Sequence, residues 1–535
     1  MPLLLLLLLT LACLPDRWPP PGGWVGSELW CALYTWLSVA GVIAFASVLA
    51  RRMRRLLERA PSQRERLLYR YQAWRFYHQV GLFLAFGVVL YAFRWGWAVQ
   101  RFSSPDASSD SVFPGAELLV LAPLLIGLIL SWCCFYDADR AFHNAPPPPD
   151  LDHAFQSTTR TSEPAKTAFW SRWTHLVFQV RHNLALVCIP VGLIILIKAL
   201  DRLIPDSSLE WQEIASFGGM LATGLLFLFM PWILRLILGL KPLPDGPLRS
   251  RLLATSRRLR FRCSNVLIWN TKSQVANAMV AGFLPWLRYV ILTDRLVNEL
   301  THEEIEAVYG HEIGHIKHHH MVFYLGFLLA SIAALWAGYS LLQGLLVRQL
   351  EGRSLLEEYP DLSIPPFVAL VGIYLFVVFG YLSRRCERQA DLYGCRAVSC
   401  GRQHCLDHNL DRELVPAGRE LCSTGIHTFM DALEKVGHLN GMSRDRPGWL
   451  QSWQHSTIAR RIDFLHDVLA DQAVEKRFQK RVALVKCALL LGVGAVLLTL
   501  TQVANWDRLV GADIPSSPPE MPVTPDTAAH TDPSE

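Results

Sequence analysis

Charged side chains are scarce in this chain. Asp, Glu, Lys and Arg make up 18% of its 535 residues, whereas soluble domains usually hold about a quarter. Apolar residues account for 51% of the chain, and its mean hydropathy is +0.24. This composition excludes an ordinary soluble protein and predicts a protein that lies largely within a membrane.

Several other signals are absent. The twelve cysteines include the adjacent pair Cys133 and Cys134 and show no framework typical of disulfide-rich secreted domains. No glycine-rich nucleotide-binding pattern and no internal repeat stands out. The net charge of +5 is explained by basic loops between apolar segments. The basic stretch 241–262 adjoins such a segment, which favours contact with anionic lipid headgroups and argues against nucleic-acid binding.

Long apolar segments recur along the chain. Most reach the length needed to cross a hydrocarbon core of about 30 Å. We therefore predict a mainly α-helical, polytopic membrane protein with about eight spans, at 30–50, 79–99, 117–136, 183–200, 215–239, 321–346, 365–382 and 481–503.

The basic residues predict which loops face the cytoplasm. An arginine-rich segment, 51–75, follows the first full span, and loops 137–182, 240–320 and 384–480 are also rich in Lys and Arg. The alternate loops hold few basic residues, so the positive-inside rule places the arginine-rich side in the cytoplasm. A bacterial inner membrane with the functional site on its cytoplasmic face is the expected location.

The most informative motif is His311-Glu312-Ile313-Gly314-His315. Thr301 and Glu304 form a capping-box signature before it, which predicts a helix. Residues four apart share one face of a helix, so both imidazoles can point at one metal ion, with Glu312 beside them as a general base. The alternative is a histidine-rich helix end at the surface, because three more histidines follow at 318–320.

A second segment, 383–391, supplies a candidate third ligand. Glu387 and Asp391 also lie four residues apart. One carboxylate could bind the metal while the other supports a ring nitrogen of a ligand histidine. Alternatively, both acids pair with neighbouring arginines on a solvated helix. The presence of the first motif favours the metal interpretation.

Together these motifs resemble the integral-membrane zinc peptidases, which include the HtpX heat-shock proteases and the type I CAAX prenyl proteases. The resemblance implies that His311, His315 and Glu387 bind one Zn²⁺ per chain and that Glu312 is the catalytic base. Asp391 is the expected outer partner. The resemblance covers roughly residues 240–470 and implies a zincin-like catalytic domain with a small β-sheet.

Two further matches belong to this resemblance. The segment Asn277-Ala278-Met279-Val280-Ala281-Gly282 fits a family segment that forms a substrate-facing edge strand, so Asn277, Ala278 and Gly282 are expected to bind substrate. His455 and Arg461 fit a late signature, although Ser456 stands where proline is usual. Both are candidates for stabilising the oxyanion, whereas packing or pairing with Asp463 is the structural alternative.

The expected function is a zinc-dependent endopeptidase that cleaves peptide bonds at the cytoplasmic membrane face, with membrane proteins as substrates in quality control. The alternatives are a CAAX-type processing protease and a non-catalytic zinc-binding scaffold or sensor. The intact Glu312 argues against the scaffold, because a structural metal site needs no base. The expected partners are polypeptides and the lipid bilayer; nucleic acid is not expected.

The chain is expected to divide into an apolar N-terminal segment (1–29), an N-terminal membrane region (30–239), a peptidase region (240–480), a last span (481–503) and a disordered tail (504–535). The linker 137–182 is expected to be cytoplasmic. Four cysteines and two histidines cluster within 395–422 in spacings that match no standard zinc module. Free thiols are therefore expected there: Cys395, Cys400, Cys405 and Cys422.

Overall fold

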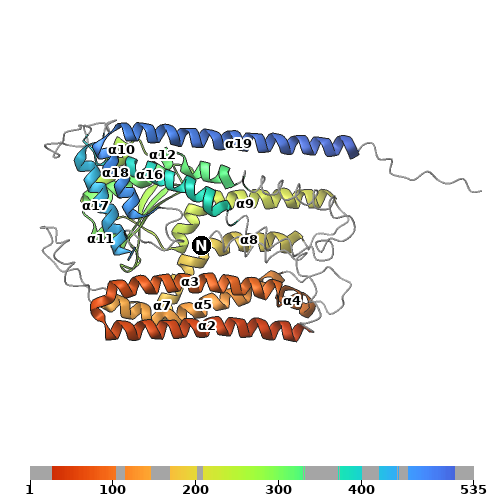
Figure 1. Ribbon diagram of the computed structural model, residues 1–535. Helices are drawn as coiled ribbons and strands as arrows, with labels where there is room; N and C mark the ends of the chain where they lie inside the picture. The colour runs from red at the N-terminus through yellow and green to blue at the C-terminus, as the bar shows by residue number, and fades with distance from the viewer. Residues whose placement is uncertain are drawn as a thin grey trace, which may run out of the picture. The chain divides into compact units, whose positions relative to one another are not determined.

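The computed structural model (Figure 1) describes residues 27–103, 115–145, 169–201, 209–328, 331, 372, 374–400, 421–442, 444 and 456–511. Within them the chain is mainly helical and holds one small mixed sheet, as the sequence predicts. It divides into two units, one of residues 1–320 and 375–475 and the other of residues 321–374 and 476–535. The candidate site lies in the first unit.

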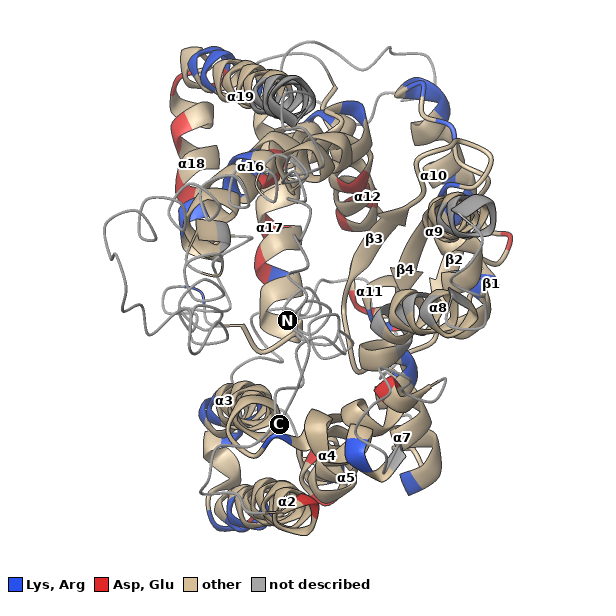
Figure 2. Cartoon of the chain, turned by 90° about the vertical axis from the view of Figure 1, so that its right-hand side faces the viewer, with Lys and Arg blue, Asp and Glu red and all other residues tan. Residues whose placement is uncertain are grey.

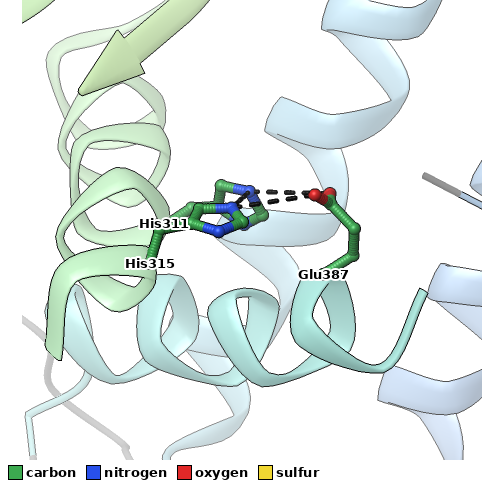
Figure 3. A group of neighbouring side chains, drawn as sticks. All are labelled: His311, His315 and Glu387. Atoms are coloured by element: carbon green, nitrogen blue, oxygen red, sulfur yellow. Dashed lines mark hydrogen bonds and ion pairs between the residues drawn. The ribbon is translucent and has the colours of Figure 1, made fainter. Parts of the chain in front are cut away.

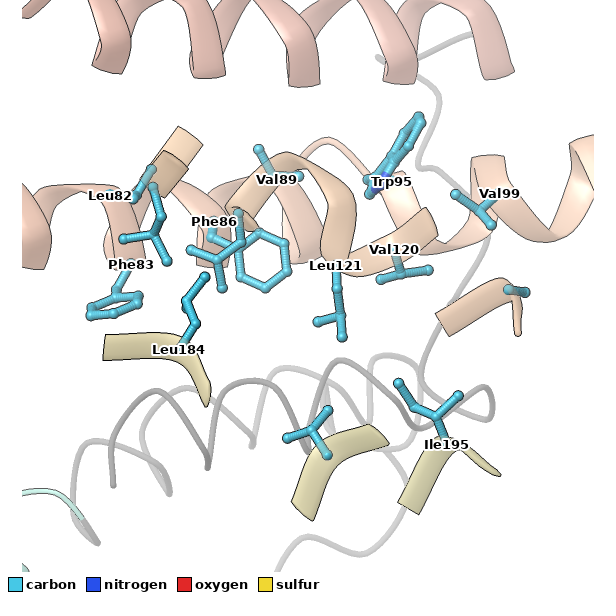
Figure 4. Close-up of a cluster of buried hydrophobic side chains, with 14 of the residues drawn as sticks. Leu82, Phe83, Phe86, Val89, Trp95, Val99, Val120, Leu121, Leu184 and Ile195 are labelled. Carbon is cyan, nitrogen blue, oxygen red and sulfur yellow. The ribbon is translucent and has the colours of Figure 1, made fainter. Parts of the chain in front are cut away.

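The N-terminal part of the first unit is a bundle of long helices: α2 (Glu28–Arg59), α3 (Arg64–Tyr91), α4 (Trp95–Ser103) and α5 (Ala116–Asn144). A short 3₁₀ turn, η2 (Pro61–Gln63), joins the first two of them. Apolar side chains from the bundle and from α8 form one buried cluster, which includes Phe86, Leu121 and Ile195 (Figure 4).

After α5 the described chain resumes with α7 (Arg172–Gln179), the π-helical turn η3 (Val180–Leu184), α8 (Ala185–Asp201) and α9 (Leu209–Ile237). The ends of the expected linker 137–182 are therefore helical, because α5 continues to Asn144 and α7 begins at Arg172.

Four helices among the described residues are long and apolar enough to cross a membrane: Glu28–Arg59, Arg66–Tyr91, Ala116–Asn144 and Phe217–Ile237. A fifth is added if the bent pair Arg172–Leu184 and Cys188–Ile197, which meet at 71°, forms one span. Residues 329, 330 and 332–346 of the expected span 321–346, and residues 365–371 and 373 of the expected span 365–382, lie outside the described residues.

Two expected boundaries are wrong. The apolar run 79–99 is not one helix, because α3 ends at Tyr91 and Arg94 adopts a left-handed φ of 54° before α4 begins. The last helix, α19 (Ala473–Gly511), continues past the expected end of its span at residue 503 and into the expected disordered tail. No proline or glycine interrupts residues 495–510, so the helix has no strong breaker there.

The peptidase region begins with the sheet. Its strands are β1 (Lys241–Pro242), β2 (Asn265–Trp269), β3 (Ala278–Ala281) and β4 (Tyr289–Thr293), in the order β1-β2-β4-β3. Strands β2 and β4 are parallel, and the other two pairs are antiparallel. All five residues of β4 are buried, because apolar clusters cover both faces of the sheet.

The helices of this region are α10 (Pro247–Arg258), α11 (Asp294–Glu299), α12 (His302–Lys317), α16 (Gly380–Ala397), α17 (Ser423–Leu439) and α18 (Ile458–Ala470). A π-helical turn, η5 (Leu375–Phe379), precedes α16. Residues of α10, α11, α12 and α17 pack with the sheet in one buried cluster that includes Leu252, Leu296 and Tyr309. Helix α12 therefore packs against both the sheet and α16.

Candidate metal centre

Helix α12 begins where the sequence predicts. The Thr301 side chain accepts a hydrogen bond from the backbone of Glu304, and the Glu304 carboxylate accepts one from the backbone of Thr301. This reciprocal capping box satisfies two backbone N–H groups at the helix start. The helix then carries the motif of residues 311–315 in its last two turns.

Glycines allow α12 and α16 to pack closely. A Cβ atom on Gly310 would lie 2.2 Å from Cβ of Ala397, and one on Gly314 would lie 2.8 Å from Cβ of Tyr393. A Cβ atom on Gly394 of α16 would lie 2.9 Å from the carbonyl oxygen of Ala307. Glycine at these three positions lets the backbone of α16 pack directly against the backbone of α12.

The close packing brings three metal-ligand atoms together (Figure 3). Nε2 of His315 lies 3.2 Å from Nε2 of His311. The Glu387 carboxylate lies 3.8 Å from Nε2 of His311 and 3.7 Å from Nε2 of His315. A tetrahedral zinc ion with bonds of about 2.0–2.2 Å requires its ligand atoms to be about 3.3–3.5 Å apart. The three donors therefore fit zinc with only small adjustments.

Asp391 contacts the ring nitrogen of His311 that does not face Glu387. Its Oδ1 lies 3.0 Å from Nδ1 of His311, and the carboxylate is fully buried. The two acids therefore have different partners: Glu387 faces Nε2 of both histidines, while Asp391 faces Nδ1 of His311. Such an outer carboxylate fixes the orientation of a ligand imidazole and makes it a stronger donor.

Charges around the site move the pKa values of both histidines. Burial alone lowers the pKa of His311, but the hydrogen bond and charge of Asp391 outweigh it and raise the pKa. For His315, burial and then the neighbouring His311 lower the pKa to about 4. The His315 ring is therefore neutral at pH 7, as a metal ligand must be.

Arg461, on α18, makes contacts that the sequence did not reveal. Its Nε donates to Oδ2 of Asp391 at 2.9 Å, and its Nη2 donates to Oδ1 of the same carboxylate. Its Nη1 lies 3.6 Å from Glu387. The sequence offers Asp463 as an ion-pair partner of Arg461, but the observed partners are Asp391 and Glu387 of α16. This geometry favours a role in positioning those acids over direct contact with an oxyanion.

The remaining expected site residues are placed as follows. Glu312 is half-buried on α12. Burial lowers the pKa of Arg461, but the charges of Asp391, Glu387 and, to a smaller extent, Glu312 outweigh burial and raise it. Asn277 is exposed just before β3, while Ala278 begins the strand and Gly282 follows it with a φ of 115°. His455 lies outside the described residues.

Two residues near the metal centre were not expected. Nδ1 of His320 lies 2.9 Å from Nδ1 of His315, and Nε2 of His320 lies 3.0 Å from Oε1 of Gln389. Both side chains are buried. The sequence hinted at His320 only as one of three consecutive histidines, whereas Gln389 lies between Glu387 and Asp391 and carries no motif of its own.

Among the described residues, His311, His315 and Glu387 are the one group of three donors close enough to share a metal ion. In the cysteine-rich segment, Cys395, Cys400 and Cys422 are buried, and Sγ of Cys422 accepts a hydrogen bond from the backbone of Gly425 at the start of α17. Cys405 lies outside the described residues.

Comparison with known proteins agrees with this geometry. Residues 242–424 match the model of peptidase family M48. Over these residues the chain is similar to that family. The matched residues include His311, His315 and Glu387, so the resemblance inferred from the motifs is confirmed. The apolar helices support an integral membrane protein.

Proteins similar to this chain include the protease HtpX homolog of Archaeoglobus fulgidus, which is 29% identical over 175 residues. That match covers 33% of this chain and 49% of the relative. The CAAX prenyl protease 1 homolog of Arabidopsis thaliana is 28% identical over 172 residues, or 29% of this chain and 38% of the relative. The chain thus spans about half, or less, of the length of these relatives.

A solved structure, that of S. mikatae Ste24p, is also similar to this chain. It is 16% identical, with a TM-score of 0.45, and the match covers 83% of this chain and 99% of Ste24p.

Proposed function

We propose that this protein is a zinc-dependent endopeptidase that cleaves polypeptides at the cytoplasmic face of its membrane, and that membrane proteins under quality control are its substrates. The observation that carries the proposal is the convergence of His311, His315 and Glu387, with Glu312 beside them on α12. A site that serves structure alone has no use for a base at that position.

The proposed chemistry divides between the metal and the chain. Zinc, when bound, supplies a Lewis acid that polarises the scissile carbonyl and lowers the pKa of water toward neutrality. The Glu312 carboxylate accepts the proton of the attacking water and transfers it to the leaving amine. Asp391 and Arg461 hold His311 and Glu387 in place, since Asp391 contacts both His311 and Arg461.

Strand β3 is the proposed substrate-binding edge. Among the described strands it pairs with β4 alone, so its other edge can offer backbone N–H and C=O groups. It also lies next to α12. An extended substrate would add to this edge through main-chain hydrogen bonds, which give affinity with little sequence preference.

A CAAX-type processing protease is the second candidate, because several relatives bear that name. Comparing the proteomes of cells that carry wild type or Glu312→Gln separates the two. Quality control predicts that many full-length membrane proteins accumulate with the variant. Accumulation confined to proteins with an unprocessed, lipidated C-terminus would reject quality control in favour of processing.

His320 is proposed to orient His315. The amide oxygen of Gln389 can only accept, so Nε2 of the neutral His320 ring carries the proton and its Nδ1 accepts from Nδ1–H of His315. Nε2 of His315 is then left with its lone pair toward the metal. His320 would thus orient the ring of His315 through its Nδ1, as Asp391 orients the ring of His311 through its Nδ1.

This role predicts a graded effect on zinc binding. His320→Ala should weaken zinc affinity by about 10–100-fold, the usual effect of losing an outer partner of a ligand histidine. His320→Asn should retain most of the affinity, because its Oδ1 occupies the position of Nδ1. Competition with a chelator measures both, and His319→Asn at the exposed neighbouring position is the control. Equal losses in the Ala and Asn variants would reject the hydrogen bond as the cause.

The proposed cytoplasmic location of the site follows from the basic loops. A single cysteine at Asn270, which is exposed after β2, and one at Ser354, in the expected outer loop 347–364, should behave oppositely in intact cells. A membrane-impermeant maleimide should label Ser354→Cys at once and Asn270→Cys only after permeabilisation, above the background of the native cysteines. Labelling of Asn270→Cys alone in intact cells would place the metal centre outside.

A further inference from the structure

The loop of residues 282–288, which joins β3 to β4, exposes two large aromatic side chains. Phe283 is 44% exposed and Trp286 is 61% exposed, and Pro285 between them is also exposed. Single exposed apolar residues are ordinary, but several adjacent ones at the tip of a hairpin mark a contact surface. Neither the sheet nor the metal centre uses these rings.

Polar contacts hold the backbone of this loop. The N–H of Leu287 donates to the carbonyl of Leu284 at 3.0 Å. Arg288, which is buried, donates through Nε to the carbonyl of Gly282 and through Nη1 to that of Arg262, both at 3.1 Å, and through Nη2 to that of Phe283. The loop is therefore ordered without help from its aromatic rings, which remain available for a partner.

The compact backbone also requires glycine at position 282. Gly282 has a φ of 115°, and a Cβ atom there would lie 2.6 Å from the carbonyl oxygen of Leu287. A left-handed, tightly packed position of this kind excludes other residues. The loop is thus built to present Phe283 and Trp286 in a fixed position.

The end of the sheet that carries this loop contacts the last turn of α9. The loop leaves β3 at Ala281 and enters β4 at Tyr289, and these two residues are paired. The guanidinium of Arg235, in the last turn of α9, lies 5.7 Å from the centre of the Tyr289 ring. Arg235 belongs to the apolar helix Phe217–Ile237, which is long enough to span a membrane.

A second segment, residues 260–262, also connects the loop to a helix that precedes an apolar run. Nζ of Lys317, the last residue of α12, donates to the carbonyl of Arg260 at 2.9 Å. Two residues further along the chain, the carbonyl of Arg262 accepts from Arg288 at the base of the loop. After Lys317 the sequence continues into the apolar run 321–346. The loop is thus connected through this segment to the end of α12, immediately before the apolar run of the sequence.

Basic residues occur in and just before the segment whose Arg262 carbonyl accepts from Arg288 at the base of the loop. Arg257, Arg260 and Arg262 are exposed, and the first of them belongs to α10, on which Figure 2 colours Lys and Arg positions blue. Aromatic rings beside basic groups match the interface of a bilayer, where rings lie at headgroup level and cations meet anionic phosphates. An apolar side chain of a soluble partner would need no such cations.

We propose that residues 282–288 lie in the lipid interface, with Phe283 and Trp286 among the headgroups and the upper acyl chains and the three arginines against the phosphates. Strand β3 then ends at the membrane surface. If the chain is the peptidase proposed above, a substrate segment leaving the bilayer meets the substrate-binding edge first. The lipid contact itself does not depend on proteolysis.

The test uses the full-length protein in nanodiscs of phosphatidylcholine and phosphatidylglycerol. An environment-sensitive fluorescent amino acid is incorporated at position 286, at 283, or, as a control, at Asn270, which is exposed after the opposite end of β2. Lipids with a nitroxide near the headgroup should quench at least half of the emission at 286 and 283, since interfacial side chains reach about 5–10 Å into the bilayer. Aqueous iodide should quench only the probe at 270.

Two outcomes would overturn the lipid contact. Iodide quenching at 286 as strong as at 270 would place the loop in water. Protection from both quenchers would show that protein covers it. The same measurements on Glu312→Gln should give identical results, so a failure of the proposed peptidase activity would leave this test intact. Where activity is present, Phe283→Ser with Trp286→Ser should slow cleavage of a membrane-anchored substrate several-fold and leave cleavage of a soluble peptide unchanged.

Discussion

Glu312→Gln should abolish most peptide hydrolysis while leaving the metal in place. The glutamine keeps the size of the side chain but cannot accept a proton, and His311, His315 and Glu387 remain as ligands. Loss of a general base costs about 10²–10⁴-fold in turnover. The rate of cleavage of a casein-type substrate and the zinc content of the same purified sample measure the two effects.

A matched control distinguishes loss of the base from loss of charge on the helix. Glu303→Gln makes the same change near the start of α12, at an exposed position where the acid pairs with Arg251 at 3.3 Å. That variant should retain both zinc and activity. A Glu312→Gln enzyme that cleaves at the wild-type rate would show that Glu312 is not the base.

Glu387→Ala should remove zinc and activity together. Glu387 provides the only carboxylate among the three converging donors, and the two imidazoles alone leave the site one ligand short of a catalytic zinc centre. We expect the loss of zinc affinity to exceed the about 10–100-fold typical of an outer-sphere partner. Zinc stoichiometry of the purified variant, measured beside its hydrolysis rate, checks this. One tightly held zinc ion in Glu387→Ala would mean that another residue completes the site.

Asp391 is the informative comparison for Glu387. Asp391→Ala removes the partner of His311 and also leaves the buried guanidinium of Arg461 without its two strongest contacts. Glu387 still lies 3.6 Å from Nη1 of Arg461, but breaking a buried ion pair costs about 3–5 kcal/mol, so this variant should lose stability as well as metal affinity. Asp391→Asn keeps an oxygen that can accept from both groups and should lose less of each.

The sequence could predict the metal centre because its parts follow helical spacing. The pairs His311 with His315 and Glu387 with Asp391 each lie one turn apart, so each pair shares a helix face wherever the helix is placed. The capping box at Thr301 and Glu304 is similarly local. The glycines at 310, 314 and 394 matter only once the two helices are in contact, and a single sequence does not show that contact.

The features that could not be predicted depend on contacts between distant segments. Arg461 approaches Asp391 across 70 positions of the chain, and nothing local to Arg461 distinguishes Asp391 from the nearer Asp463. His320 contacts His315 only because the chain turns after α12, where His319 adopts a φ of 56°. The sequence also hides the break after α3, since the apolar run continues on both sides of Arg94 and the nearest glycine, Gly96, lies within α4 and not at the break.

The most direct test of the account is a zinc titration of the metal-free protein, followed by the rate of peptide cleavage. The protein would be stripped with a chelator in its membrane environment and titrated with zinc. A site built from His311, His315 and Glu387 predicts that cleavage is lost on stripping and returns in full at one equivalent of zinc per chain. Cleavage that survives complete removal of the metal, or that one equivalent does not restore, would contradict it.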